Sequence, residues 1–289
     1  MMARTRAPRL MWLPALHFQI ETSTSKKDKA MSEHARKLVA SYYQKLWSDD
    51  VEEALSQYLS PSYLEHQYTA AFSAEGLKDY INIRRQSATD HKVVIHHTLS
   101  EGDLVFLMAE EKLGGDVDYA RAEMFRLEGD LIVEHWGAEV LDDKNRKNPN
   151  GTFDGAQVNR DVDHAAQFGA RFEAWDQRGF DGQELDVFDI SRIPEYKQHS
   201  PKGGDGLDGL VSILSKAKAA GIKTSMTCFR TLCDGDFVVS HRLYDTEPTH
   251  PLMNRIYTFD MFRLDAEGRA VEHWDVMNPV PSADYLARM

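Results

Sequence analysis

The chain has 289 residues, of which 42% are hydrophobic and 28% charged, and its formal net charge is −12 at pH 7. It is longer than a typical domain of about 100–150 residues, so we expect two compact units. The composition is that of a globular protein and not of a disordered or membrane class. The acidic balance counts against nucleic acid and anionic membranes as partners, because both require a basic surface.

The first thirty residues differ from the rest of the chain. Several arginines precede a short apolar patch that Pro14 interrupts, and no small-residue cleavage site follows. We interpret residues 1–30 as a disordered leader, or as an extension upstream of a second start at Met31.

The two cysteines and the hydropathy pattern bear on location. Cys228 and Cys233 have an odd spacing, which places them on opposite faces of a strand and disfavours a disulfide between them. No later run reaches the 18 or more apolar residues of a membrane span. We therefore expect a cytoplasmic protein in a reducing compartment.

The first half of the chain predicts helices followed by strands. Helical spacing of apolar residues indicates helices over 34–47 and 74–86. Four β-rich segments follow, separated by turns of the Glu-Gly-Asp type: 92–99, 103–112, 119–129 and 131–140. Alternation along the first of these strands should point His96 and His97 to opposite faces, which disfavours a shared metal site.

A polar stretch separates this region from the second half. Residues 141–161 are rich in Asn and Gly and contain Asn-Pro and Asn-Gly breakers. We therefore assign a first domain to residues 31–145, a linker to 146–160 and a second domain to 161–289.

The second half predicts the same series of elements. Helices are indicated over 163–175 and over 205–221, where Gly221 is a candidate C-terminal cap. A run of hairpin-connected strands follows. This order predicts an α+β fold in which helices pack on one face of an antiparallel sheet.

The two halves also repeat each other in sequence. Four blocks recur in the same order: Tyr-x-x-His at 63 and 196, Gly-Asp at 102 and 235, Met-Phe-Arg-Leu at 124 and 261, and Val-Glu-His-Trp at 133 and 271. Repeated blocks in a fixed order indicate a tandem duplication.

The C-terminal copy carries the fuller pattern. Its order of Tyr-x-x-His, Gly-Asp followed by His241, Asp260-x-Phe-Arg, and Glu-His-Trp-Asp ending at Asp275 resembles the SnoaL-like branch of the NTF2-like superfamily. The resemblance covers most of residues 35–289. It implies two tandem cone domains, each a bent antiparallel sheet wrapped around N-terminal helices, with a pocket at one end. The founding members of that branch are polyketide cyclases that close a ring by aldol condensation without a metal or organic cofactor.

The N-terminal copy departs from this pattern at three positions. In the alignment of the matched blocks, Met108 takes the place of His241. Glu123 takes the place of Asp260, and Gly137 takes the place of Asp275. Residues shared by both copies are expected to hold the fold. Residues unique to the C-terminal copy are the better candidates for chemistry.

An aldol reaction requires a base beside the carbonyl and a donor for the developing oxyanion. Asp260 is the candidate base, because burial in an apolar pocket would raise its pKa. His241 on the neighbouring strand is the candidate to polarise the carbonyl or to hold the carboxylate, although the sequence does not fix the register. The alternatives are an Asp260 in a salt bridge and a half-buried His241 with satisfied hydrogen bonds.

Other residues are candidates for the pocket or its surroundings: His273, Asp275, Tyr196, His199, Trp274 and Arg263. His273 and Asp275 should share one face of the last strand, where the carboxylate could orient the imidazole. Trp274 and its twin Trp136 are more typical of a core or an interface.

Two functions from different classes follow. The first is a cofactor-independent acid–base enzyme, such as an aldol cyclase, isomerase or hydratase, acting on a small apolar carbonyl compound in the C-terminal domain. The second is a non-catalytic small-molecule-binding or scaffold protein. The sequence lacks the GxGxxG, GxxxxGK[ST] and GxSxG motifs, and we expect no cofactor and no metal. The two domains are expected to pair within the chain as a pseudo-dimer.

Overall fold

The structure is a computed structural model that describes residues 26–48, 50–67, 70–115, 117–181, 183–185, 195–247, 255–280 and 282–287. Residues 1–25 of the expected leader lie outside the described residues. Helix α1 (Lys26–Leu46) begins before Met31, so the expected boundary at residue 30 falls inside a helix. Among the described helices, none combines the length and apolarity that a membrane span requires.

The first half forms a five-stranded sheet with three helices. Its strands lie in the order β1-β5-β4-β3-β2. The remaining elements of this half, in chain order, are α2 (Val51–Tyr58), β1 (Leu59–Glu65), α3 (Ala74–Ser87), β2 (Lys92–Glu101), β3 (Leu104–Lys112), β4 (Asp118–Glu128) and β5 (Leu131–Leu141). The start of α3 is fixed by Ser73, whose hydroxyl accepts a hydrogen bond from the Gly76 amide.

The second half forms another five-stranded sheet with the corresponding strand order, β6-β10-β9-β8-β7. Its elements are α4 (His164–Phe180), β6 (Lys197–Gln198), α5 (Gly206–Ala219), β7 (Lys223–Asp234), β8 (Phe237–Glu247), β9 (Ile256–Leu264), β10 (Ala270–Pro279) and α6 (Ala283–Leu286). As predicted, Gly221 follows α5 with a positive φ of 72°.

The sheets are mixed and not wholly antiparallel. In each half the Tyr-x-x-His block forms an edge strand, β1 or β6, that runs parallel to the last strand of its sheet. The expectation of a purely antiparallel sheet was wrong here. Strand β6 has only two residues, too few for an alternating pattern in the sequence, and β1 pairs with β5 in an irregular register.

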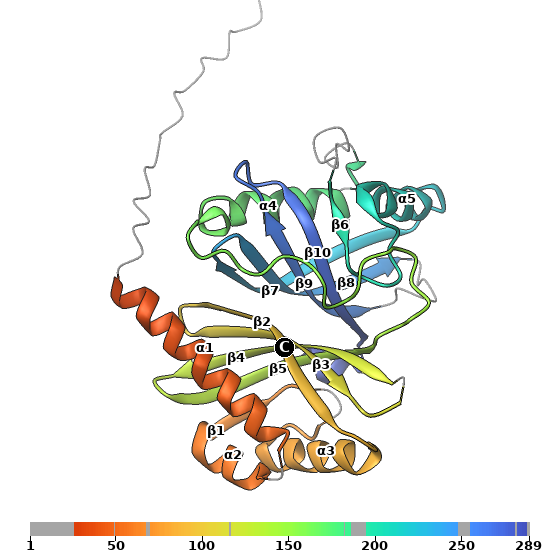
Figure 1. Cartoon of the computed structure of the whole chain (residues 1–289). Helices are drawn as coiled ribbons and strands as arrows, with labels where there is room; N and C mark the ends of the chain where they lie inside the picture. Colours follow the sequence, from red (N-terminus) through yellow and green to blue (C-terminus); the bar gives the residue numbers. More distant parts are fainter. Residues whose placement is uncertain are drawn as a thin grey trace, which may run out of the picture.

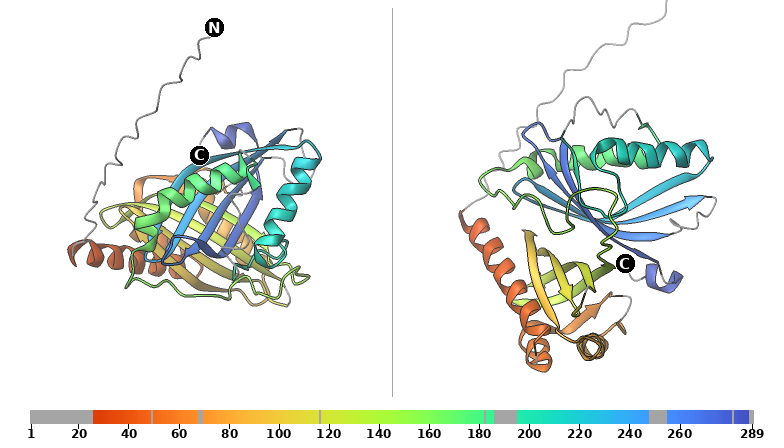
Figure 2. Two further views of the ribbon diagram at one scale, coloured as in Figure 1. Left: turned by 90° about the horizontal axis from the view of Figure 1, so that it is seen from above. Right: turned by 45° about the vertical axis from the view of Figure 1, so that its right-hand side comes forward.

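Each sheet has a helix-covered face and a face turned toward the other sheet (Figure 1). A second view shows α4 and α5 on the side of the second sheet that faces away from the first half (Figure 2). Between the sheets lies one apolar cluster with residues from both halves, including Phe106, Trp136, Phe259 and Trp274. The two tryptophans thus lie in the core, as the sequence predicted.

Contacts across this interface occur in matched pairs. The His97 ring lies 5.5 Å from the Trp274 ring, and the Arg230 guanidinium lies 3.6 Å from the centre of the Trp136 ring. His97 and Arg230 stand at equivalent places, each just after a β-bulge in the first antiparallel strand of its half. Equivalent positions therefore contact equivalent partners in both directions, as at a two-fold interface.

The segment between the halves is bound to the second half. Asn148 donates hydrogen bonds to the Ser200 and Gly203 carbonyls, and Asn150 donates to the carbonyl of Gln198. Arg146 donates to the carbonyl of His199. The polar composition that predicted a linker supplies side chains that hold the edge strand β6 in place.

Candidate active site

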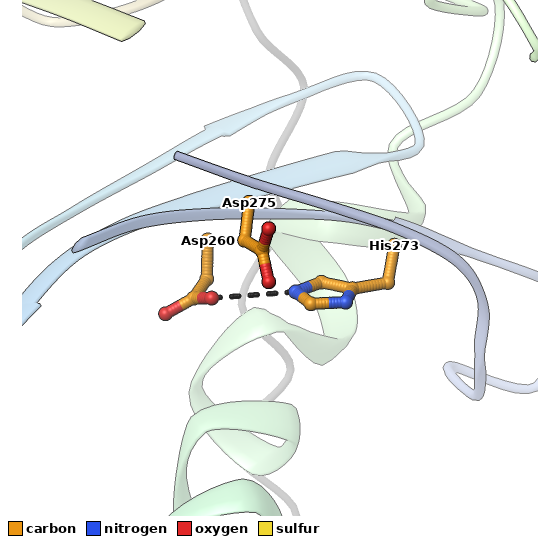
Figure 3. Close-up of side chains that lie close together, drawn as sticks. All are labelled: Asp260, His273 and Asp275. Carbon is orange, nitrogen blue, oxygen red and sulfur yellow. Dashed lines mark hydrogen bonds and ion pairs between the residues drawn. The ribbon is translucent and has the colours of Figure 1, made fainter. Parts of the chain in front are cut away.

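A buried polar cluster lies on the helix-covered face of the second sheet. Asp260 on β9 and Asp275 on β10 are directly paired in the register, and His273 lies two residues before Asp275 on the same face. One nitrogen or carboxylate oxygen from each of these three side chains lies within 4.8 Å of the other two. Figure 3 shows the imidazole of His273 turned toward the two carboxylates.

His241 does not belong to this cluster, so the predicted pairing with Asp260 was wrong. The register pairs Asp260 with Ser240, and it pairs His241 with Phe259. Side chains alternate along strands, so His241 points to the opposite face, where its ring stacks at 4.4 Å on Phe259 in the interface. Burial, followed by the nearby Arg230, holds the pKa of His241 well below its usual range.

Gln198 determines the tautomer of His273. The Ser200 amide donates to Oε1 of Gln198 at 2.9 Å, which identifies that atom as the carbonyl oxygen. Nδ1 of His273 lies 3.1 Å from the same oxygen and must carry a proton to bond to it. On the other side, Nε2 lies 3.3 Å from Oδ1 of Asp260. A proton held by either of these two atoms would complete a hydrogen bond between the imidazole and Asp260.

The second oxygen of Asp260 is also held. It accepts a hydrogen bond from the Tyr244 hydroxyl at 3.2 Å, and Nη1 of Arg242 lies 3.9 Å away. The fully buried Arg242 guanidinium also binds Asp176 on α4. Burial raises the pKa of Asp176 to about 6. Asp260 is thus a fixed carboxylate with three partners.

Asp275 differs from Asp260 in its surroundings, and a hydrogen bond with Ser200 is among the contacts that act on it. It is partly exposed, whereas Asp260 and His273 are buried. Burial of the carboxyl is the main cause that raises the pKa of Asp275, and the neighbouring Asp260 adds to it against the effect of His273. A carboxylate with a raised pKa beside a fixed histidine–carboxylate pair is suited to accept a proton.

The remaining predicted site residues fall into two groups. The buried ring of Tyr196 lies beside the cluster, with its centre 6.4 Å from that of His273. His199, Trp274 and Arg263 lie away from the cluster. His199 and Arg263 both bind Glu272, and Trp274 donates to the carbonyl of Asp154.

Sequence reasoning missed Gln198, Tyr244, Arg242 and Asp176. Two of them left a signal. Gln198 lies inside the repeated Tyr-x-x-His block, where the first half has Glu65, and Asp176 lies four residues after Phe172 on the apolar stripe of α4. Tyr244 and Arg242 depend on the pairing of β8 with β9, which no sequence pattern specifies.

The first half contains a related but more heavily charged cluster. Nδ1 of His135 lies 2.9 Å from Glu65, and its Nε2 lies 2.9 Å from Glu123. Glu123 also accepts from Nε of Arg121 at 2.7 Å. Burial opposes the charge on His135, yet Glu65 and Glu123 raise its pKa to about 9. The sequence comparison treated Glu123 as a departure from the pattern of the C-terminal copy. In the structure Glu123 contacts His135 as Asp260 contacts His273.

The donor set of Asp260, His273 and Asp275 is also one that could hold a divalent cation. Gln198 would then orient the histidine through Nδ1, as partners of metal-bound histidines do. The Arg242 guanidinium lies 3.9 Å from Asp260, and its positive charge would repel a metal cation bound there.

Comparisons with known proteins give partial structural likeness. No protein-family profile matches the chain, and no curated protein sequence is significantly similar to it. IdmH from Streptomyces antibioticus, provisionally assigned as a polyketide cyclase, is 20% identical, with a TM-score of 0.33, over 36% of this chain and 91% of its own. A provisionally assigned polyketide cyclase from Bacillus cereus ATCC 10987 is 21% identical, with a TM-score of 0.35, over 40% of this chain and 79% of its own.

A third solved structure is a provisionally assigned SnoaL-like polyketide cyclase from Jannaschia sp. CCS1. It is 14% identical, with a TM-score of 0.34, over 37% of this chain and 86% of its own. Each of these similarities spans less than half of the present chain.

Proposed function

We propose that the second half is a cofactor-independent acid–base enzyme that acts on a small, largely apolar carbonyl compound, as an aldol cyclase, isomerase or hydratase. The observation that carries this proposal is the close contact between Nε2 of His273 and Oδ1 of Asp260, placed beside a carboxylate whose pKa is raised.

In this mechanism Asp275 removes a proton from the carbon next to the carbonyl group. The proton between His273 and Asp260 is donated to the enolate oxygen that develops, and Gln198 keeps the imidazole in the required tautomer. The rings of Tyr196 and Phe262 lie beside His273 and supply an apolar wall. Asp275 replaces Asp260 as the base, because Asp260 is already held by three partners.

We also propose that the chain is a tandem duplication of SnoaL-like cone domains that pair within the chain. The shared strand order and the matched contacts of His97 and Arg230 support this origin. The first half then acts as a scaffold for the second.

A non-catalytic ligand-binding role is the second candidate. It is favoured by the hydrogen bonds that Asp260 and His273 already make within the fold. Polar groups held in this way can have a structural role without taking part in a reaction.

The test separates these roles. Small ketones are first screened for binding by ligand-observed NMR, and each binder is then followed in D₂O for exchange of the hydrogens next to its carbonyl. We expect exchange that Asp275→Asn slows by about 10²-fold or more, while binding is retained. Asp245→Asn, which removes a β8 carboxylate that pairs with Arg255, is the control and should leave exchange unchanged.

Two results would contradict the enzyme. Binding without exchange by the unmodified protein favours the ligand-binding role. Exchange that requires an added divalent cation assigns the cluster to a metal.

A further inference from the structure

A hollow outside the polar cluster lies at the junction of the two halves. It has a volume of about 220 Å³, and it is lined by β2 and by the end of the segment between the halves: Ile95, His96, His97, Thr98, Gln157, Val158 and Arg160. Since a water molecule occupies about 30 Å³ of the liquid, the hollow can hold only a small molecule.

A β-bulge brings both adjacent histidines to this hollow. The pairing of β2 with β3 shifts between Ile95 and His97, so His96 is the extra residue. The expectation that His96 and His97 point to opposite faces of the strand does not hold at this bulge, since both line the same hollow, while the expected lack of a shared metal site stays a prediction. His96 stacks at 4.6 Å on Phe153 of the connecting segment and contacts Glu110.

His97 is buried without hydrogen bonds. Its exposed fraction is 2%, and neither ring nitrogen has a partner among the residues that the structure describes. The charged or titratable groups that act on it are His96, Glu272 and His199, and burial is the main cause that lowers its pKa to about 4. Both ring nitrogens are also shielded from solvent, so a positive charge on this ring has no hydrogen-bond partner within the described part of the chain.

Arg160 supplies a charged donor at the same hollow. Its Nε and Nη2 bind Asp234, and Nη1 makes no hydrogen bond within the described part of the chain. Arg36 also reaches Asp234, at 3.3 Å, so two guanidiniums share one carboxylate. Burial and then Arg160 lower the pKa of Arg36. Asp234 and then Glu33 act on the pKa of Arg36 in the opposite direction.

We propose that this hollow is a binding site for a small oxyanion, a carboxylate or a phosphate, which accepts hydrogen bonds from Arg160 and Gln157 and lies beside the buried His97. The anion relieves the repulsion between the two arginines and places a negative charge near the His97 ring. Because the lining comes from the first half and the connecting segment, while Asp234 comes from the second, the bound anion links the two halves. This site is independent of the reaction proposed above.

The test is an NMR titration of the His97 ring in the full chain. Sodium acetate and sodium phosphate are added in separate arms at constant ionic strength, with chloride as the replaced ion. We expect a saturable shift of the His97 signals by at least one of the two anions, with a Kd of about 1 mM or lower. Binding should tighten as the pH falls, because the anion stabilises the protonated imidazole.

Variants assign the effect to the site. Arg160→Gln should weaken binding about tenfold or more. Gln157→Leu changes an exposed side chain, so it keeps the test valid if Arg160→Gln does not fold, and it should also weaken binding. Arg269→Gln, which removes an arginine paired with Asp265, is the matched control and should bind as the unmodified protein does.

A response to acetate alone identifies a carboxylate site, and a response to phosphate alone identifies a phosphate site. Absence of a saturable shift in both arms would overturn the proposal. Unchanged affinity in both Arg160→Gln and Gln157→Leu would overturn it as well.

Discussion

His135 in the first half and His273 in the second occupy equivalent places in two sheets of the same strand order, yet their chemistry differs. His135 lies between the carboxylates Glu65 and Glu123, and it remains a cation at neutral pH because its pKa is about 9. His273 lies between the amide of Gln198 and the carboxylate of Asp260, so it faces one carboxylate instead of two. One Glu-to-Gln difference within a repeated block thus separates a fixed ion pair from a candidate proton donor.

The second difference is one of space. A Cβ atom at Gly137 would lie 2.2 Å from Oε1 of Gln67 and 2.3 Å from Oε2 of Glu123. The longer Glu123 therefore requires glycine opposite it, whereas the shorter Asp260 leaves room for Asp275. The exchange of Asp for Gly at this position follows from packing in the first half and adds a carboxylate in the second.

The largest expected effect is on stability, through the histidines. His135→Gln leaves Glu65 and Glu123 without their shared cation in a buried site, and we expect the free energy of unfolding to fall by about 3–5 kcal/mol. The matched variant His273→Gln should cost less, because Asp260 keeps Tyr244 and Arg242. Urea denaturation of both variants measures the difference. Equal losses would mean that the two clusters have the same structural role.

Alkaline pH should weaken the first cluster next. The folded-state pKa of His135, about 9, lies above the ordinary value near 6.5, so its stabilisation is complete below about pH 6.5 and is lost as the pH rises through about 9. The expected loss is about 3 kcal/mol, read from urea melts at both ends of this range. A profile of the same slope in His135→Gln would assign the loss to another group.

A smaller effect is expected from filling the space at residue 137. Gly137→Ala pushes on the buried Gln67 and Glu123 side chains, and we expect a destabilisation of about 1–3 kcal/mol. Gly204→Ala is the control, because a Cβ there meets only the Cα of Gly209, at 3.5 Å. Thermal melts compare the two, and a neutral Gly137→Ala would show that the first cluster can shift.

The smallest change in stability is expected from exchanging Glu65 and Gln198, the residues that contact Nδ1 of the two histidines. This exchange is also the most direct test of the comparison. Glu65→Gln should lower the pKa of His135, because one of its two carboxylates is lost. Gln198→Glu gives His273 a second carboxylate, and its ring should then carry both protons at pH 7. Nitrogen chemical shifts of the two rings read these states directly. If neither ring changes, the residue at position 65 or 198 does not control the proton.

Much of the fold could be predicted from sequence, because its signals are local. Helical spacing indicated α1, α3, α4 and α5, and alternation correctly placed Asp260 and Phe262 on the face opposite Phe259. The edge strands β1 and β6 and the short helix α2 were missed. Strand β6 has only two residues, and both edge strands are held by pairing with a distant strand.

The candidate site was predicted only in part. Asp260, His273 and Asp275 were named from the repeated motif, and strand parity placed the last two together. The error at His241 came from the register, because a one-residue change in pairing moves a side chain to the other face. Gln198 and Arg242 reach the cluster from a neighbouring edge strand and from β8, so their roles depend on contacts between segments far apart in the chain.

The sequence by itself determined the longer helices and the hairpin-connected strands, the repeated sequence blocks and the identity of the polar residues, because periodicity and composition act over short distances. The tertiary structure alone decided which face each strand turns to the helices, which carboxylate meets which histidine, and that two adjacent histidines share one hollow. Those outcomes depend on register, on a bulge and on burial, and each arises only when distant segments pack together.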